Sequence, residues 1–415
     1  MIPFTGSEQI YGSTHEDVRR HNLSILLRTV HRDGPTSRSK LAQMMSLNKS
    51  TIGALTKELL DLELVEERVP NTNIQAGRPS RVVAPNGRVV AIAVNPEVGA
   101  VTIGIVSLGG KVLRRVRYAL PPGRSAEHAV ELSGAFIDGM RSELDRDFLV
   151  AGVGVAVPGM VHGPDGSVTL APHVGWAKPI AGLLQEVAGH PVFADNDARL
   201  GSLAERQFGV GRGVDDLIYL HGGANGVSGG IIAGGAVVSG FSGYAGAFGH
   251  VRTNHGDGTD SAGMSGTLEA EVTRSALLEA LDLHDADPDQ LEAALLASTE
   301  PRVRRVVEMQ LDRLAVALAN AVNILNPRLI VLGGFLASLY AAAPEHLGNS
   351  LAAKSLPGAF RGVEIRASAL GFDMLLIGAA ELVFDRILDD PSKERLVRRT
   401  ETVNGSEEEE GWQDR

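Results

Sequence analysis

Apolar residues in the first part of the chain recur at helical spacing in three separate segments. The first predicted helix covers roughly 18–33 and ends at Gly34-Pro35, a pair that commonly stops a helix. A short second helix follows Ser37, which is a good N-cap residue, and a third helix is expected from about Lys49 to Leu60. The apolar positions that define the three helices are Leu23, Ile25, Leu26, Leu27, Val30, Leu41, Ala42, Met45, Ile52, Leu55, Leu59 and Leu60.

Two short strand patterns follow the third helix, over 64–68 and 81–83, and a polar loop separates them. The loop contains Gly77-Arg78-Pro79. Three helices followed by a hairpin are typical of a winged helix-turn-helix. We therefore expect residues 1–85 to form a winged helix-turn-helix domain.

The remainder of the chain has a β-rich, glycine-punctuated pattern that occurs twice. Residues 91–113 and 216–240 share one plan, in which a strand, a glycine-bearing turn, a second strand, a Gly-Gly turn and a third strand follow one another. This repeat predicts an α/β domain over 86–390 with two similar lobes and a cleft between them. Helices are expected at 125–145, 267–283, 288–297 and 301–325, and a further strand at 329–332. The acidic segment 391–415 is predicted to be a disordered tail.

Composition and charge narrow the classes of protein that fit. The 415 residues include no cysteine, and no secretion signal or membrane-spanning run is recognisable. We expect a cytoplasmic protein without membrane contacts. Residues 1–85 carry 11 Lys and Arg against 9 Asp and Glu, whereas the whole chain has a formal charge of −11. An acidic body repels nucleic acid, so any DNA contact must come from the N-terminal domain.

The third helix has the residues of a DNA-recognition helix at its start. Asparagine can read adenine through two hydrogen bonds, and lysine can read guanine or contact phosphate. Two cations at the start of the preceding helix suit phosphate contacts. The candidate DNA-binding residues are Arg38, Lys40, Asn48, Lys49, Ser50, Thr51 and Lys57. A winged helix that makes only protein contacts is the alternative.

Arg78 in the predicted wing is a further DNA-binding candidate. A narrow minor groove has an enhanced negative potential that attracts an inserted arginine. Gly77 allows close approach, and Pro79 holds the arginine extended. Outside this context, the same three residues would be an ordinary solvated turn.

Six motifs follow one another along the body: GVGVAVPGMV (152–161), LAPHVGW (170–176), VFADNDARLGSLAE (192–205), GYAGAFGHV (243–251), NAVNILNPRLIVLGG (320–334) and LLIGAAELV (375–383). In this order they resemble the ROK family of repressors and sugar kinases. The N-terminal domain resembles that of the family's transcription-regulator branch, which includes the xylose and N-acetylglucosamine repressors. The resemblance covers roughly 17–385 and implies a two-lobed, actin-like (ribonuclease-H-like) sugar-kinase fold.

The resemblance implies that Asn196, Asp197, His250 and Glu269 contact a sugar between the lobes. In the family's kinases, the aspartate at the position of Asp197 is the general base, so here it is a vestigial base candidate. Carboxylate, amide and imidazole groups suit hydroxyls that both donate and accept hydrogen bonds. The alternatives are that Asp197 caps the helix at 197–206 and that His250 is structural.

Several positions depart from the family pattern. Ala247 stands where the family has a sugar-contacting glutamate, and the family's three zinc-binding cysteines fall on Asp260, Ala262 and Thr267. The usual zinc site therefore cannot form, and we expect no metal. His255, Asp257 and Asp260 are more typical of a polar loop than of a metal site.

The two phosphate-binding turns also differ. Asn95-Pro96-Glu97 occupies the first turn, where it offers no aspartate for magnesium and adds a negative charge. The second turn, 222–230, is glycine-rich but lacks the family's Gly-Thr-Gly order. Phosphoryl transfer requires neutralised, well-placed phosphates, so we expect no enzymatic activity and no cofactor.

These patterns favour a DNA-binding transcriptional regulator of carbohydrate-metabolism genes, a repressor that responds to a sugar or sugar derivative. We expect it to bind an operator in double-stranded DNA as a homodimer or homotetramer. The alternative is an ATP-dependent sugar kinase with an appended DNA-binding domain. A dinucleotide-binding oxidoreductase, suggested by Gly152-Val153-Gly154, is rejected because the third glycine and the downstream acid are missing.

Overall fold

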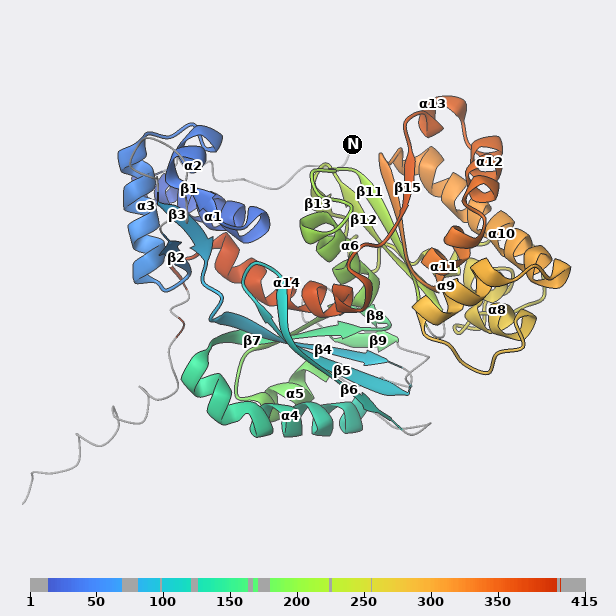
Figure 1. The fold of residues 1–415 in the computed structure, drawn as a ribbon, viewed down its shortest axis with the longest axis horizontal. Helices are drawn as coiled ribbons and strands as arrows, with labels where there is room; N and C mark the ends of the chain where they lie inside the picture. The colour runs from blue at the N-terminus through green and yellow to red at the C-terminus, as the bar shows by residue number, and fades with distance from the viewer. Residues whose placement is uncertain are drawn as a thin grey trace, which may run out of the picture. The chain divides into compact units, whose positions relative to one another are not determined.

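The structure is a computed structural model that describes residues 14–68, 81–97, 99–120, 126–162, 167–170, 180–223, 226–254, 256–393 and 396. The chain divides into two compact units (Figure 1). The first combines Met1–Val89 with Phe384–Arg415, and the second is Val90–Val383. Helix α14 (Met374–Asp389) therefore begins in the second unit and ends in the first.

Three helices and a three-stranded sheet form the N-terminal part of the first unit. Helix α2 begins after Ser37, whose hydroxyl accepts a hydrogen bond of 3.2 Å from the Lys40 amide, so the predicted N-cap is confirmed. The sheet has the order β1-β3-β2 and is antiparallel. The elements are α1 (His15–Asp33), β1 (Thr36–Ser37), α2 (Arg38–Met44), α3 (Lys49–Asp61), β2 (Val65–Arg68) and β3 (Val82–Pro85).

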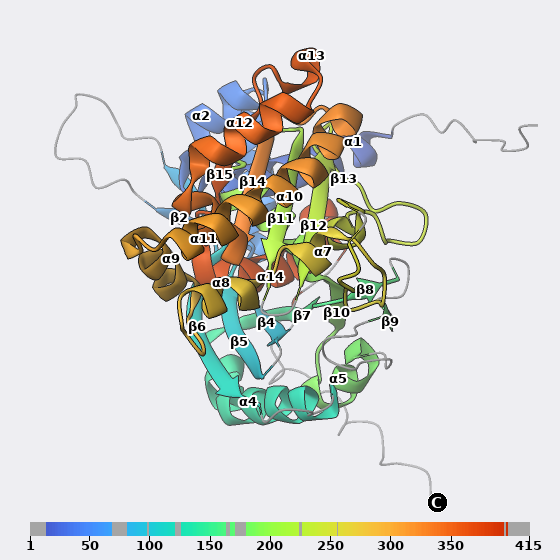
Figure 2. The ribbon, with the colours of Figure 1, turned by 90° about the vertical axis from the view of Figure 1, so that its right-hand side faces the viewer.

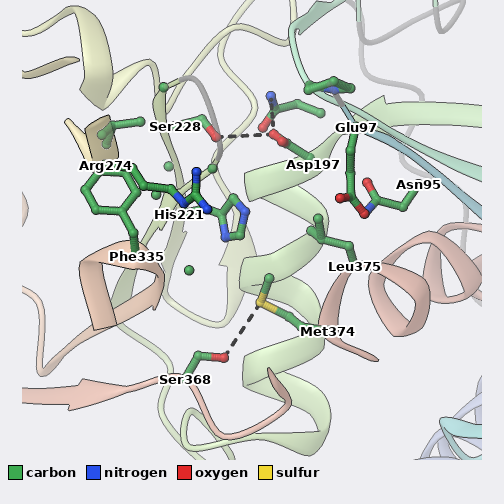
Figure 3. A pocket seen from close by; sticks show the side chains of 18 of the residues that line it. Asn95, Glu97, Asp197, His221, Ser228, Arg274, Phe335, Ser368, Met374 and Leu375 are labelled. Carbon is green, nitrogen blue, oxygen red and sulfur yellow. Dashed lines mark hydrogen bonds between the residues drawn. The ribbon is translucent and has the colours of Figure 1, made fainter. Parts of the chain in front are cut away.

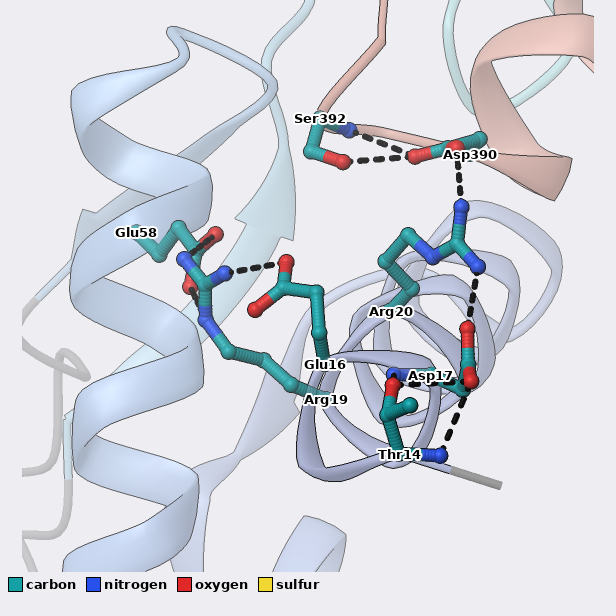
Figure 4. Close-up of polar contacts among 8 residues, drawn as sticks. All are labelled: Thr14, Glu16, Asp17, Arg19, Arg20, Glu58, Asp390 and Ser392. Carbon is teal, nitrogen blue, oxygen red and sulfur yellow. Dashed lines mark hydrogen bonds and ion pairs between the residues drawn. The ribbon is translucent and has the colours of Figure 1, made fainter. Parts of the chain in front are cut away.

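The end of α14 supplies part of the first unit's interior. Leu388 is buried, and the ring of Phe384 meets that of His31 edge to face with centroids 5.8 Å apart. Arg28 on α1 forms ion pairs with Asp385 and Asp389. Figure 4 shows the neighbouring contacts, in which Arg20 pairs with both Asp17 and Asp390.

The second unit contains two five-stranded sheets, each at the centre of one lobe. The first sheet has the order β10-β7-β4-β5-β6, and helices α4 and α5 pack together beneath it (Figures 1 and 2). A small hairpin, β8-β9, adjoins it. The elements are β4 (Val89–Glu97), β5 (Ala100–Ser107), β6 (Lys111–Ala119), α4 (Ala126–Asp147), β7 (Leu149–Val157), β8 (Met160–Val161), β9 (Val168–Leu170), α5 (Ile180–Ala188) and β10 (Val192–Asn196).

The second lobe repeats the opening plan of the first, as the sequence predicts. Its sheet has the order β13-β12-β11-β14-β15, with α6 packed against β11 and β12. The long helix α10 packs on α12, and buried leucines and valines of α10 form much of this lobe's core. The elements up to the long helix are α6 (Asp197–Phe208), β11 (Leu217–Gly222), β12 (Val227–Ala233), β13 (Ala236–Val237), α7 (Leu268–Glu271), α8 (Arg274–Ala280), α9 (Pro288–Ala297) and α10 (Pro301–Leu325). The chain continues through β14 (Leu329–Gly334), α11 (Phe335–Ala342), α12 (Pro344–Lys354), α13 (Pro357–Phe360) and β15 (Glu364–Ala367).

One predicted helix is interrupted in the structure, and one glycine of the predicted strands has a packing role. The helix expected at 267–283 is broken, because α7 ends at Glu271 and Thr273 is the N-cap of α8, where its hydroxyl accepts a hydrogen bond of 3.3 Å from the Ala276 amide. Gly154 allows close packing, since a Cβ there would lie 1.9 Å from the carbonyl oxygen of Ala379 on α14.

None of the helices within the described ranges has the length and hydropathy to cross a membrane.

Candidate functional site

The second unit contains a cavity of about 910 Å³, lined by residues from both of its lobes. This volume lies in the range of typical small-molecule sites. Asn196, Asp197, His250 and Glu269 all line it, although they come from three separate segments of the chain. The structure therefore brings together the four residues that the sequence suggests as ligand contacts (Figure 3 shows part of the cavity around Asp197).

Asn196 and Asp197 lie where β10 passes into α6. Asn196, not Asp197, is the N-cap: its side-chain oxygen accepts a hydrogen bond of 3.0 Å from the Arg199 amide, and its Nδ2 donates to the Gly159 carbonyl at 2.9 Å. The Oδ1 of Asp197 accepts a hydrogen bond of 2.7 Å from the main-chain amide of Ala198 and one of 3.2 Å from the Ser228 hydroxyl. The capping alternative for Asp197 is thus wrong.

An ion pair between the buried Arg199 and the partly buried Asp195 lies next to this turn. Arg199 pairs with Asp195 and also donates from Nη1 to the Gly243 carbonyl at 2.8 Å. Burial raises the pKa of Asp195 above its ordinary value, although the Arg199 guanidinium acts in the opposite direction. The pair links the Asn196 turn to the loop that precedes His250. Sequence reasoning did not single out either residue, because i,i+4 charges at a helix start are common on exposed helices.

His250 is oriented by Asp260. Its Nδ1 lies 2.8 Å from Asp260 Oδ2, so that the carboxylate favours a proton on Nδ1 and leaves Nε2 as the second polar atom of the ring. Asp260 also accepts hydrogen bonds from the Thr267 hydroxyl at 3.0 Å and from the amides of Ala262 and Met264 at 2.9 and 2.8 Å. Burial raises the pKa of Asp260, but these hydrogen bonds outweigh it, and the pKa lies below its ordinary value.

The Asp260 contacts connect the positions that the family resemblance assigns to zinc ligands. Asp260, Ala262 and Thr267 are held to one another by hydrogen bonds of the carboxylate. Within the described residues, no group of three or more His, Asp or Glu side chains is arranged to hold a metal ion. His255 lies outside the described residues.

Glu269 joins the loop after His250 to strand β12. Its Oε1 accepts a hydrogen bond of 3.0 Å from the Ser261 amide, and its Oε2 accepts one of 3.1 Å from the Val227 amide. Oε1 also accepts a hydrogen bond from the Ser261 hydroxyl, so this oxygen already has two donors. Glu269 therefore shapes the cavity wall by joining the loop after His250 to β12.

The prediction that Asn95, Pro96 and Glu97 form a turn is wrong, because all three are strand residues of β4 paired with β5. The polar contacts at this end of β4 centre on Glu97. Its carboxylate accepts hydrogen bonds from Asn95 Nδ2 at 3.2 Å and from the Thr102 hydroxyl at 2.9 Å, and it pairs with Arg117 at 3.2 Å. All four residues line the cavity.

His221, at the end of β11, is a cavity residue that the sequence did not single out. The Tyr219 hydroxyl lies 2.9 Å from its Nδ1, and the rings stack with centroids 6.2 Å apart. Burial lowers the pKa of His221 to about 4, so the ring is neutral at pH 7.

In the first unit, the candidate DNA-binding residues lie at the start of α2 and α3 and along α3. Asn48 caps α3, and its Oδ1 accepts hydrogen bonds from the Thr51 amide at 2.8 Å, the Ser50 hydroxyl at 2.6 Å and the Thr51 hydroxyl at 3.0 Å. The side-chain oxygen of Asn48 is thereby occupied. Reading adenine with both side-chain atoms would require this cap to open, which the sequence did not predict.

The cations of this region fall into two groups. Arg38 Nε lies 2.5 Å from Glu67 Oε1, and the same carboxylate also pairs with Arg81. In contrast, the exposed side chains of Lys40, Lys49 and Lys57 have no ion pair with any described residue. Arg78 lies outside the described residues, and its role stays a prediction.

The two-lobed body and its cavity define a protein with a sugar-kinase-like fold. The chain belongs to the ROK family, whose model matches residues 92–386, more than half of the chain. It is 27% identical over 408 residues to the xylose repressor of Caldicellulosiruptor bescii, an alignment that covers 91% of this chain and 98% of that protein.

Two solved structures show the same fold. A ROK family transcriptional regulator, a homolog of the E. coli MLC protein, is similar with a TM-score of 0.72 and 22% identity, over 90% of this chain and 97% of that one. A ROK family glucokinase from Streptomyces griseus, in complex with glucose and AMPPNP, is similar with a TM-score of 0.59 and 25% identity, over 71% of this chain and 98% of that one. The alignment with the regulator therefore covers more of this chain, 90%, than the alignment with the glucokinase, 71%.

Proposed function

We propose that this protein is a DNA-binding transcriptional repressor of carbohydrate-metabolism genes that responds to a sugar or sugar derivative. One observation carries the proposal. A single chain joins two units: one presents exposed lysines on two short helices, without an ion pair to any described residue, and the other has a cavity that gathers four side chains suited to hydroxyl groups. The similarity to the xylose repressor over nine-tenths of the chain supports it. The repressor acts in the cytoplasm as a homodimer or homotetramer.

In this proposal, the first unit is a winged helix-turn-helix and α3 is its recognition helix. Lys49 and Lys57 contact phosphate or guanine from α3, and Lys40 contacts phosphate from α2. Ser50, Thr51 and the Asn48 amide lie at the groove-facing end of α3. Arg38 reaches phosphate only if its pairing with Glu67 loosens, and Arg78 enters the minor groove.

In the cavity, Asn196, Asp197, His250 and Glu269 bind the sugar. The carboxylates accept hydrogen bonds from hydroxyl groups, and Nε2 of His250 accepts another because Asp260 holds the proton on Nδ1. The ligand changes the equilibrium between lobe arrangements and so the affinity for the operator.

A sugar kinase with an appended DNA-binding unit is the second candidate. The retained Asp197 in the cavity and the similarity to the Streptomyces griseus glucokinase favour it. We consider the protein a non-enzyme, because Asn95, Pro96 and Glu97 offer neither a magnesium-binding aspartate nor a full set of amides for phosphate.

Two measurements test the proposal. In a gel-shift series, the protein should bind DNA from its own promoter region with sequence preference, and binding should weaken as salt rises. Sugar should change that affinity in the wild type but not in Asp197→Ala. If no fragment is bound selectively, the repressor assignment fails. Turnover of ATP with any sugar, abolished in Asp197→Asn, would establish the kinase instead.

A further inference from the structure

Carboxylates dominate the charged groups that line the cavity. Among the described lining residues, they outnumber the permanently charged cations. The negative field of the surplus disfavours a second anion in a partly enclosed space. The acidic residues are Glu97, Asp197, Glu269, Asp285, Asp287, Asp289 and Glu292, and the cations are Arg115, Arg117 and Arg274.

Each of these three arginines is already engaged by a carboxylate. Arg117 pairs with Glu97 at 3.2 Å, Arg115 with Asp373 at 2.8 Å and Arg274 with Asp285 at 2.5 Å. A phosphate entering the cavity would have to displace one of these partners, because a guanidinium binds phosphate through the same donors that hold the carboxylate.

Glu97 is the best-fixed of the three carboxylate partners. Arg115 and Arg274 pair with side chains that are themselves exposed. Glu97 accepts two further hydrogen bonds, from Asn95 and Thr102, whereas Asp285 accepts one more, from the Ala286 amide, so the charge of Glu97 is the most firmly held and stays beside Arg117. The carboxylate of Glu97 therefore takes up the hydrogen-bond donors of Arg117, which a bound phosphate would need.

Around His221, the only permanently charged cation among the described lining residues is Arg274, which Asp285 already engages. His221 is neutral at pH 7, and Phe335, Met374 and Leu375 add apolar surface to the lining (Figure 3). Hydroxyl groups and apolar sugar faces suit such a wall, whereas a triphosphate does not.

We propose that this cavity accepts uncharged carbohydrates and rejects sugar phosphates and nucleotides, and that Glu97 is the specificity-determining residue. The inference deepens the proposed function, since it rests on the cavity being a sugar site and assigns the chemical class of its ligand. Glu97 acts in two ways. It neutralises the charge of Arg117 before any ligand binds, and it repels the negative charge of a phosphate group.

Isothermal titration calorimetry of the full chain tests this with glucose 6-phosphate and AMPPNP as anionic probes and a panel of uncharged mono- and disaccharides. The wild type should bind either anion at least about tenfold more weakly than its best uncharged sugar, since the carboxylates repel a further negative charge. Glu97→Gln keeps an acceptor for Asn95 and Thr102 but frees Arg117, and it should bind the anions about tenfold more tightly than the wild type.

Two further variants serve as controls. Glu143→Gln frees Arg114, which is on the same strand but does not line the cavity, and it should leave anion binding unchanged. Adding Arg117→Met to Glu97→Gln should remove the gain. Tight anion binding by the wild type, or no gain in Glu97→Gln, would overturn the inference. Those results leave the proposed function standing, which fails separately if no sugar of either kind alters DNA binding.

Discussion

The Ser24 hydroxyl donates a hydrogen bond of 2.6 Å to the main-chain carbonyl of Leu388, although 364 residues separate the two in sequence. The contact lies within the first unit, because the end of α14 folds with the N-terminal helices. Residues after Phe384 are therefore part of the unit to which we assign DNA binding.

The first prediction concerns Leu388, which is fully buried in that unit. Leu388→Ala should lower the free energy of unfolding of the first unit by about 2–5 kcal/mol, because it leaves a cavity in a packed interior. Urea unfolding and gel shifts measure the loss. Leu356→Ala, at an exposed leucine, is the matched control and should change neither. Equal stability of the two variants would contradict the assignment of α14's end to the interior.

The N-cap of α3 gives a second prediction. Asn48→Ala removes the acceptor for Ser50 and Thr51 and should cost about 1 kcal/mol of stability as well as DNA affinity. Asn48→Asp keeps the cap but places a negative charge near phosphate, so it should retain stability and lose affinity. Thermal unfolding beside gel shifts separates the two effects. Unchanged DNA binding in Asn48→Asp would show that α3 does not enter a groove.

Lys49 tests the phosphate contacts. Lys49→Ala should weaken DNA binding and reduce the slope of log K against log salt by about 1, the value for one lost phosphate contact. The affinity measured between low and moderate salt gives this slope. Lys111→Ala, at an exposed lysine of the second unit, should leave it unchanged. A slope that stays constant in Lys49→Ala would remove that residue from the interface.

His221 predicts a pH dependence of stability. Between pH 6.5 and about 4 the unfolded chain binds a proton that the folded His221 does not, so the free energy of unfolding should fall as pH falls through this window. The loss amounts to about 3 kcal/mol at most and is complete below about pH 4. Urea unfolding of the wild type and His221→Gln at several pH values measures it. The variant should show a flatter profile, whereas His284→Gln, at an exposed site, should match the wild type.

Asp260 tests how His250 is positioned. Asp260→Asn keeps the size of the side chain but weakens its hold on the Nδ1 proton of His250, and it should reduce sugar affinity about tenfold or more, in the range expected for a lost orienting partner. Affinity measured at two pH values, together with thermal stability, distinguishes positioning from simple unfolding. A variant that is less stable but binds sugar normally would show that Asp260 only holds the loop together.

The sequence predicted what depends on local pattern. The Ser37 cap, the third helix from Lys49 and the repeated opening of the two lobes follow from hydrophobic spacing and glycine turns, and the structure confirms them. The break before Thr273 was missed because the apolar spacing continues through it. Patterns of this kind report short-range preferences, which tertiary packing can override.

Contacts between distant residues lay beyond such reasoning. No periodicity links Ser24 to Leu388, and nothing in the motif around His250 indicates that Asp260 would hold both the histidine and Thr267. The pairing of Glu97 with Arg117 depends on the register of β4, β5 and β6. The motifs identified four of the residues that line the cavity, Asn196, Asp197, His250 and Glu269, and the structure adds their orientation and the lining residues that the motifs missed, such as His221.

Because α14 returns to the N-terminal helices, the ribosome makes Ser24 long before Leu388. The first unit can therefore complete its interior only after the whole second unit has been synthesised. A chain that ends before Phe384 lacks the side chains that α14 adds to that interior, and its N-terminal helices should be less stable than those of the full chain.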